Sequence, residues 1–288
     1  MAGTIRLGIA GWVFDEWRNG AFYPPGLRQK DELAYASRHL STLEINATFY
    51  SHQKPASFAA WAAATPDDFV FTVKGHQLVT HLKRLKDVEI PLANFFASGV
   101  LALGSRLGPF CWQLPGNLRY DRERLETFLE LLPKDIDALL ALARKADGLK
   151  TEPFLDASNV GTIRHAIELR HESFATPEVI DLLGAHNVAL VTADTADWPA
   201  TDVTADFVYC RLQGAPGAER YDPEQLATRA GWLQDWATGR TPDAPRLAPP
   251  MAATPRDVFA VFVSTDKPNA PRNALAVMRQ LGLRGDDA

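Results

Sequence analysis

Charged residues alternate with aliphatic ones in a short stretch near the middle of the chain, residues 166–174 (AIELRHESF). Glu168 lies between Ile167 and Leu169, Arg170 follows Leu169, and His171 comes directly after Arg170. Because successive side chains of a strand point to opposite faces, a strand here would place both charged residues on one face. A carboxylate, a guanidinium and an imidazole at one strand end could hold an anion or transfer a proton.

Several other strand-like runs repeat this arrangement. In these runs, the polar residues expected on the strand face opposite to the aliphatic ones are Glu44, Asn46, Lys74, Gln113, Glu168, Arg170, Arg211 and Gln213. The face that Asp194 takes is ambiguous. Two carboxylates with different neighbours can hold different pKa values, so Glu44 and Glu168 form the candidate acid–base pair. We assign catalytic roles to Glu44, Glu168, His171, Lys74 and Asp194. Substrate contacts are assigned to Trp12, Asn46, Tyr50, His81, Gln113, Arg170, Arg211 and Gln213.

These residues also have a purely structural interpretation. A salt-bridge network could fill one end of a barrel, with both glutamates serving only as ion-pair acceptors. His171 could anchor a loop, and Asp194 could cap a strand end. The functional interpretation gains weight because at least five runs contribute polar residues to the same end, where aliphatic layers would serve stability equally well.

Eight strand-like runs must position these side chains, and all but the sixth are followed by a helix-like stretch. The runs are 5–12, 42–50, 69–75, 108–115, 166–174, 188–195, 206–214 and 257–265; the helices are 30–39, 57–64, 91–107, 122–132, 136–144, 177–185, 222–236 and 270–281. This alternation predicts an α/β protein with a parallel sheet. Eight units in 288 residues fit a single closed (β/α)8 TIM-type barrel better than an open sheet. We expect one domain over 1–288, with a flexible tail from about residue 284.

Composition limits the partners of the chain. A net charge of -5 gives no global attraction to nucleic acid or to a membrane surface, although the basic stretch 76–86 leaves a nucleic-acid ligand open. No apolar run reaches the length of a membrane span, and the N-terminus lacks a signal-peptide core, so we expect a cytoplasmic protein. Cys111 and Cys210 lie in strand-like runs and are expected to be buried thiols. The sequence carries no signal for an oligomeric state.

A divalent metal is the one cofactor that the residues leave open. Glu44, Glu168, His171 and Asp194 would supply oxygen and imidazole ligands for Mg²⁺, Mn²⁺ or Zn²⁺. No HxH, HExxH or CxxC spacing supports such a site, so no cofactor is established.

Motifs spread over most of the chain resemble one known family. They include GxxGW at 8–12, LEINATFY at 43–50, Thr80-His81, QLP at 113–115, ELRH at 168–171 and RLQG at 211–214. In this order they are similar to the YecE-like family, which is classed as a domain of unknown function (number seventy-two). The resemblance implies a TIM-type barrel and implies no established reaction.

Two functions from different classes remain open. The first is an enzyme with acid–base chemistry, of hydrolase or lyase type, acting on a small anionic substrate that is phosphorylated or nucleotide-like; cleavage of a nucleic-acid phosphodiester is a variant of it. The second is a non-catalytic barrel that binds an anionic or nucleic-acid ligand through the same residues.

Overall fold

The computed structural model describes residues 2–195, 198, 200–214, 221–263 and 267–283. Eight parallel strands follow one another in sequence order around a closed barrel, so the predicted (β/α)8 fold is confirmed. The chain divides into two compact units, one formed by Met1–Glu44 with Ala175–Ala288 and the other by Ile45–Phe174. The two units are described in turn.

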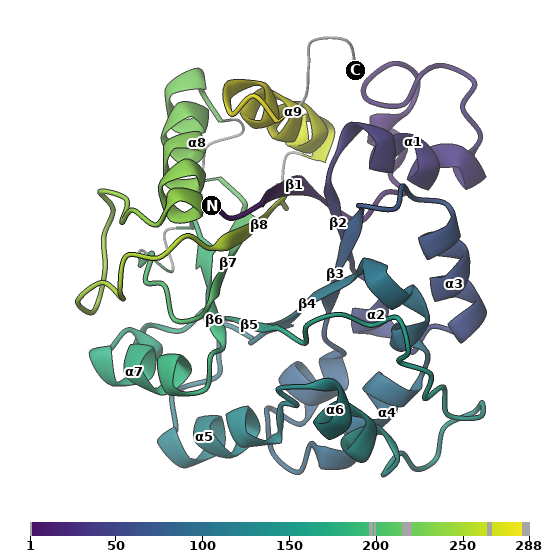
Figure 1. The fold of residues 1–288 in the computed structure, drawn as a ribbon, viewed down its shortest axis with the longest axis vertical. Coiled ribbons are helices and arrows are strands. Elements are labelled where there is room, and N and C mark those ends of the chain that lie inside the picture. Colours follow the sequence, from purple (N-terminus) through teal and green to yellow (C-terminus); the bar gives the residue numbers. More distant parts are fainter. Residues whose placement is uncertain (1, 196–197, 199, 215–220, 264–266, 284–288) are drawn as a thin grey trace. The chain divides into compact units, whose positions relative to one another are not determined.

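The first unit contains five strands in the order β6-β7-β8-β1-β2. They are β1 (Ile5–Ala10), β2 (Thr42–Ile45), β6 (Ala189–Ala193), β7 (Phe207–Leu212) and β8 (Asp257–Phe262). Its helices are α1 (Glu32–His39), α7 (Pro177–Ala185), α8 (Pro223–Thr238) and α9 (Ala270–Gln280), with short turns η1 (Asp15–Trp17), η2 (Gln29–Asp31) and η6 (Lys267–Asn269). Helices α8 and α9 lie side by side against β8 and β1 (Figure 1).

Local sequence signals set the ends of the long helices. The Asp222 side chain accepts the backbone N–H of Gln225 at 2.7 Å, and the Gln225 side chain accepts the N–H of Asp222 at 3.1 Å, which closes a capping box at the start of α8. The same helix ends at Gly239, whose φ of 83° is costly for residues with a Cβ. Helix α7 starts with Thr176 as its cap and Pro177 in the first turn.

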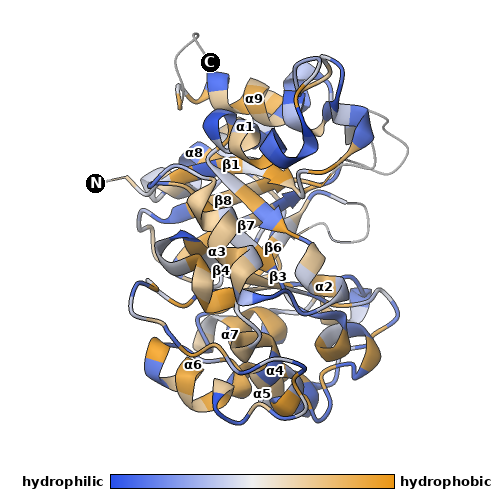
Figure 2. Ribbon diagram, turned by 90° about the vertical axis from the view of Figure 1, so that its right-hand side faces the viewer, coloured by the Kyte–Doolittle hydropathy of each residue, from blue (hydrophilic) through white to orange (hydrophobic). Residues whose placement is uncertain are grey.

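The second unit contains three strands, β3 (Val70–Lys74), β4 (Leu107–Gln113) and β5 (His165–Glu168). Its helices are α2 (Ala47–Tyr50), α3 (Pro55–Ala63), α4 (Glu89–Ala97), α5 (Arg122–Leu131) and α6 (Ile136–Ala143), with a π-helical turn η3 (Leu78–Leu82) and 3-10 segments η4 (Val100–Arg106) and η5 (Glu172–Phe174). Phe95, Phe96, Phe110 and Trp112 form a buried aromatic cluster between α4 and β4. Outer helices such as α6 in this unit and α9 in the first carry both hydrophobic and hydrophilic residues (Figure 2), as expected for helices with one face on a core.

Three predicted elements differ from the structure. The strand predicted over 42–50 ends at Ile45 and turns into α2, because the Thr48 hydroxyl bonds the carbonyl oxygens of Ile45 (3.0 Å) and Lys74 (2.7 Å). The predicted strand in 166–174 ends at Glu168, which leaves Arg170 and His171 in the following loop. The helix predicted over 91–107 is broken at Gly99, whose φ is 137°, into α4 and η4.

Other expectations hold for the described residues. Cys111 and Cys210 are buried free thiols, and burial raises the pKa of Cys210. Between β6 and β7 the described residues contain no helix, which matches the exception made for the sixth strand. Within those same described ranges, no helix combines the length and the hydropathy needed to cross a membrane. The predicted tail beyond residue 283 lies outside the described residues.

Candidate functional site

A buried ion pair joins two strands of the first unit. Arg211 on β7 donates from Nη2 to Oε1 of Glu44 (2.9 Å) and from Nε to Oε2 (3.0 Å), and the Tyr209 hydroxyl donates to the same Oε2 (2.9 Å). Because β1 and β8 separate β2 from β7, these three side chains meet on one face of the sheet. The side chains of Glu44 and Arg211 are 0% and 2% exposed, and both carboxylate oxygens have donors. This geometry favours the structural interpretation of Glu44 and Arg211.

Asp194, directly after β6, is held by four donors. Its Oδ1 accepts the backbone N–H groups of Gln213 (2.7 Å) and Gly214 (3.1 Å), and its Oδ2 accepts the Tyr221 hydroxyl (2.5 Å) and Nε of Arg229 (3.2 Å). Burial and the charge of Asp194 raise the pKa of Tyr221. The carboxylate thus ties the loop after β7 and helix α8 to the end of β6, as a strand-end cap would.

The second unit brings together polar residues from the carboxyl ends of its strands. Gln113 and Glu168 are the last residues of β4 and β5 and are cross-strand neighbours. The Gln113 amide donates to Oε2 of Glu168 (2.9 Å), and Nε of Arg170 donates to Oε1 (2.7 Å). Glu168 is 1% exposed, whereas Arg170 is 37% exposed. The buried carboxylate therefore orients a guanidinium that solvent and ligands can reach.

Lys74 and His81 complete this cluster. Lys74 is the last residue of β3, and its Nζ lies 4.2 Å from the centre of the Phe49 ring. The same ring meets the His81 imidazole edge to face at 4.9 Å. Nδ1 of His81 is in hydrogen-bond contact with the Thr80 hydroxyl at 2.8 Å.

Electrostatics tie His81 to the charged members of the cluster. Burial lowers the pKa of His81, the positive charges of Lys74 and Arg170 lower it further, and the charge of Glu168 acts in the opposite direction. The imidazole is therefore predominantly neutral near pH 7 and able to accept a proton. We define the β3–β5 cluster as Lys74, His81, Gln113, Glu168 and Arg170.

The loop that carries His81 has an unusual backbone. His81 belongs to the π-helical turn η3, and a turn of this type occurs frequently at functional sites. Three residues that follow it have left-handed φ values: Arg84 (53°), Leu85 (68°) and Asp87 (50°). Such conformations cost energy for residues with a Cβ and concentrate at sites where geometry matters. The loop therefore holds His81 in a defined position.

The remaining predicted residues lie outside these contacts. Nδ1 of His171 accepts the backbone N–H of Ser173 at 3.1 Å, as a loop anchor would, and Tyr50 is 69% exposed. Asn46 precedes α2, and its Oδ1 is buried without a hydrogen-bond partner among the described residues. The Trp12 carbonyl oxygen accepts the Tyr23 hydroxyl at 2.6 Å. Roles for these side chains in a reaction stay predictions.

The metal set suggested by the sequence is not gathered into a site in the described part of the chain. Searched over those residues, the structure has no group of three or more His, Cys, Asp or Glu side chains that could hold a metal ion. The sequence also gave no role to Thr80, although its hydroxyl contacts the His81 ring. The only sequence signal for Thr80 was the Thr80-His81 pair in the family motif.

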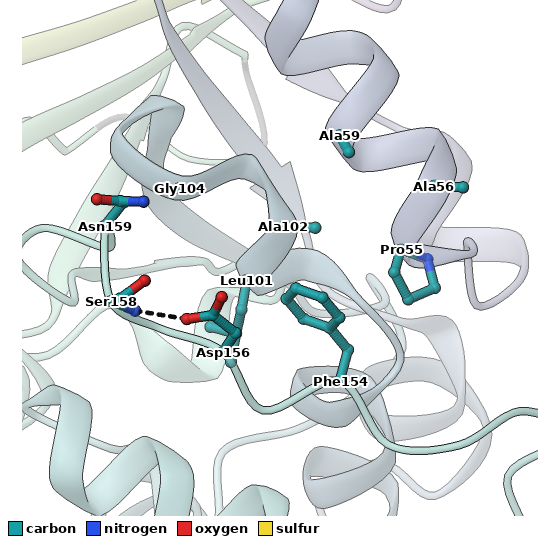
Figure 3. Close-up of a pocket in the computed structure, with 10 residues that line it drawn as sticks. All are labelled: Pro55, Ala56, Ala59, Leu101, Ala102, Gly104, Phe154, Asp156, Ser158 and Asn159. Carbon is teal, nitrogen blue, oxygen red and sulfur yellow. Dashed lines mark hydrogen bonds between the residues drawn. The ribbon is translucent and has the colours of Figure 1, made fainter.

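The second unit also contains a cavity of about 300 Å³ (Figure 3). No residue of the β3–β5 cluster lines it. It is lined by Pro55, Ala56, Ala59, Leu101, Ala102, Gly104, Phe154, Asp156, Ser158 and Asn159. Asp156 is the only titratable residue among them, and its Oδ1 accepts the Ser158 backbone N–H at 3.0 Å. That hydrogen bond lowers the pKa of Asp156. The lining offers a largely apolar surface without an acid–base pair.

Comparison with known families identifies the chain. A family model described as "Protein of unknown function DUF72" matches residues 6–288. The chain belongs to the DUF72 family. The resemblance drawn from the motifs is therefore confirmed.

Relatives within the DUF72 family are distant in sequence. The UPF0759 protein YecE of Escherichia coli (strain K12) is 26% identical over 170 residues, which cover 59% of this chain and 50% of YecE. The UPF0759 protein YunF of Bacillus subtilis (strain 168) is 31% identical over 80 residues, which cover 28% of this chain and 27% of YunF. The matched part thus spans about half the length of YecE.

Solved structures of the family share the fold. The DUF72 family protein TM1631 from Thermotoga maritima MSB8 is similar with a TM-score of 0.72 and 23% identity, over 97% of this chain and 99% of TM1631. The DUF72 family protein EF0366 from Enterococcus faecalis V583 has a TM-score of 0.67 and 17% identity, over 98% and 97% of the two chains. At these identities the likeness establishes the fold alone.

Proposed function

We propose that the protein is an enzyme that performs acid–base chemistry, of hydrolase or lyase type, on a small anionic substrate that is phosphorylated or nucleotide-like. The β3–β5 cluster is its proposed centre. The observation that carries this proposal is that the half-buried His81 imidazole and the Lys74 ammonium both lie against the Phe49 ring, at 4.9 and 4.2 Å from its centre. Burial and the charges of Lys74 and Arg170 lower the pKa of this imidazole. A proton acceptor beside two cations suits a reaction on a negatively charged molecule.

Each member of the cluster has a distinct proposed role. His81 accepts a proton from the substrate or from water, and the Thr80 hydroxyl fixes its ring. Lys74 and Arg170 bind the substrate anion, since ammonium and guanidinium groups both suit phosphate or carboxylate oxygens. Glu168 orients Arg170 and is itself held by Gln113. This moves His81 from a predicted substrate contact to the proposed base.

The first experiment separates catalysis from binding. A mixture of sugar phosphates and nucleotides is incubated with the protein, and mass spectrometry follows product formation. For any compound that is converted, His81→Gln is expected to lower kcat by about 100-fold or more with little change in KM. In the native enzyme, kcat/KM should fall as the pH drops below the lowered pKa of His81, because the protonated ring accepts no proton.

Two further variants sharpen this test. Glu168→Gln is expected to lower kcat/KM by about tenfold or more, because Arg170 loses the carboxylate that orients it toward the substrate anion. His186→Gln is the matched control, because this half-buried histidine follows α7 and is not a member of the β3–β5 cluster. Equal turnover in native protein, His81→Gln and Glu168→Gln would refute the catalytic assignment.

One observation favours a non-catalytic barrel that binds an anionic or nucleic-acid ligand. Both candidate glutamates are engaged in ion pairs, Glu44 with Arg211 and Glu168 with Arg170. In that case no compound of the mixture is converted, and Arg170→Ala weakens binding of the anion as strongly as Glu168→Gln does. Conversion of a compound in an His81-dependent reaction rules this alternative out.

A further inference from the structure

A second cavity of the second unit, about 370 Å³ in volume, has a positively charged lining. Its walls come from residues 51–54 before α3, His76 after β3, Asn94 of α4, Ser98 directly after α4, and the loop 148–151. The volume lies at the lower end of the range of small-molecule sites in proteins. None of the cluster residues proposed above as the catalytic centre lines this cavity.

The lining of this cavity contains two lysines. Lys54 and Lys150 line the cavity, and within the described residues neither forms an ion pair. No aspartate or glutamate belongs to the lining. Two ammonium groups on one cavity repel each other unless an anion lies between them. The lining is therefore complementary to a multiply charged anion.

A histidine pair adds a hydrogen-bond donor of known position. His52 and His76 stack with ring centres 4.6 Å apart and an angle of 13° between their planes. Nδ1 of His76 accepts the backbone N–H of Leu78 at 3.0 Å, so the neutral ring must carry its proton on Nε2. Burial and the charge of His52 lower the pKa of His76 to about 4, so the ring is neutral near pH 7 and donates from Nε2.

The wall that carries Lys150 is fixed by paired hydrogen bonds. The Asn94 side chain donates to the carbonyl oxygen of Asp147 at 2.8 Å and accepts the Asp147 N–H at 2.9 Å. Gly148 follows with a φ of 72°, which turns the chain toward the cavity residues 149–151. The loop is therefore anchored next to the cation it supplies, which lowers the entropy cost of binding a ligand there.

From this arrangement we propose that the cavity formed by Lys54, Lys150, His52 and His76 binds the phosphate group of a small phosphorylated metabolite. The two ammonium groups balance the charge of the phosphate dianion, and Nε2 of His76 donates to one of its oxygens. The remaining volume, beside Leu149 and Asn94, accommodates an attached group of about the size of a pentose. This site is separate from the proposed catalytic centre and stands without it.

Calorimetric titration with ribose 5-phosphate, inorganic phosphate and ribose tests the proposal. Ribose 5-phosphate is expected to bind with a Kd below about 1 mM, inorganic phosphate more weakly, and ribose not at all. Lys54→Ala and Lys150→Ala should each weaken ribose 5-phosphate binding by about tenfold or more. Both lysines are exposed, so these variants should fold as the native protein does. NMR signals of the His52 and His76 rings should shift on addition of the ligand.

Two control variants keep the result interpretable. Lys134→Ala removes another exposed lysine, which does not line this cavity. This variant should bind ribose 5-phosphate with the affinity of the native protein. Lys74→Ala alters the proposed catalytic cluster, and it should leave the ligand-induced NMR shifts of the His52 and His76 rings in place. Binding lost in Lys74→Ala but kept in Lys54→Ala would assign the anion to the catalytic cluster and overturn the cavity proposal. Equal binding of ribose and ribose 5-phosphate, or native affinity in both lysine variants, would overturn it as well.

Discussion

Breaking the Glu44–Arg211 ion pair from one side should destabilise the protein strongly, whereas changing both residues should cost much less. Arg211→Met leaves the Glu44 carboxylate, which is 0% exposed, with the Tyr209 hydroxyl as its one remaining donor among the residues that the structure describes. An uncompensated buried charge costs about 3–5 kcal/mol. Glu44→Gln removes the negative charge that faces the buried Arg211 guanidinium. In the double variant no charge remains, and the Gln amide keeps the Tyr209 contact, so we expect a loss of about 1–3 kcal/mol.

Urea unfolding followed by circular dichroism measures all three free energies of unfolding. The expected sum of the single losses exceeds the loss in the double variant by at least about 2 kcal/mol. A matched control is the exposed Glu89–Lys145 pair, whose side chains are 46% and 56% exposed. Removing it should cost less than about 1 kcal/mol. Additive single effects at Glu44 and Arg211, or losses no larger than those of the control, would refute the view that this pair is a structural unit.

Three further predictions concern the stability of the fold. His165 donates from Nε2 to the Pro133 carbonyl oxygen, and burial lowers its pKa to about 4 from 6.5, so the unfolded chain binds a proton that the folded protein excludes. The contribution of neutral His165 to the free energy of unfolding is complete above pH 6.5 and decreases as the pH falls toward 4. Urea unfolding should show about 2 kcal/mol of stability lost between pH 7.5 and 5. His165→Gln should remove this pH-dependent loss. Asp202 is 3% exposed and accepts the N–H groups of Leu247 and Ala248 at 2.9 Å, so Asp202→Ala should cost about 1–3 kcal/mol and make the segment 239–255 sensitive to limited proteolysis. A Cβ at Gly75 would lie 2.2 Å from the Trp112 ring, so Gly75→Ala should lower the free energy of unfolding by about 1–3 kcal/mol and be detectable in near-ultraviolet circular dichroism.

The order of strands and helices was predictable because each element carries its own signal. Helix α7 begins at Pro177 and ends at Ala185 as predicted, since a Thr-Pro start and an apolar periodicity act locally. The end of β2 was not predictable in the same way. Thr48, Phe49 and Tyr50 all favour strands, yet the Thr48 hydroxyl bonds the carbonyl oxygen of Lys74 on a neighbouring strand and stabilises a helical turn. Such a contact depends on residues far apart in sequence.

The site was predictable in its residue types but not in its pairings. The alternation of polar and aliphatic residues predicted polar side chains at strand ends, and Lys74, Gln113 and Glu168 are indeed the last residues of their strands. Sequence spacing could not say which cation each glutamate takes, because that choice depends on strand register and on which strands face each other. Arg211 meets Glu44 across two intervening strands, a separation that no local pattern encodes.

These pairings change which residues can do chemistry. Glu44 and Arg211 form an ion pair with each other and are almost completely buried, so a ligand could reach neither without disturbing a buried ion pair. Glu168 is equally buried, but its partner Arg170 is 37% exposed and extends the charge of the cluster toward solvent. An anion that approached Arg170 would compete with Glu168 for the guanidinium and would meet His81 as a neutral base. In the mechanism that we propose, Glu168 therefore acts through Arg170, and the proton transfer is assigned to the His81 imidazole.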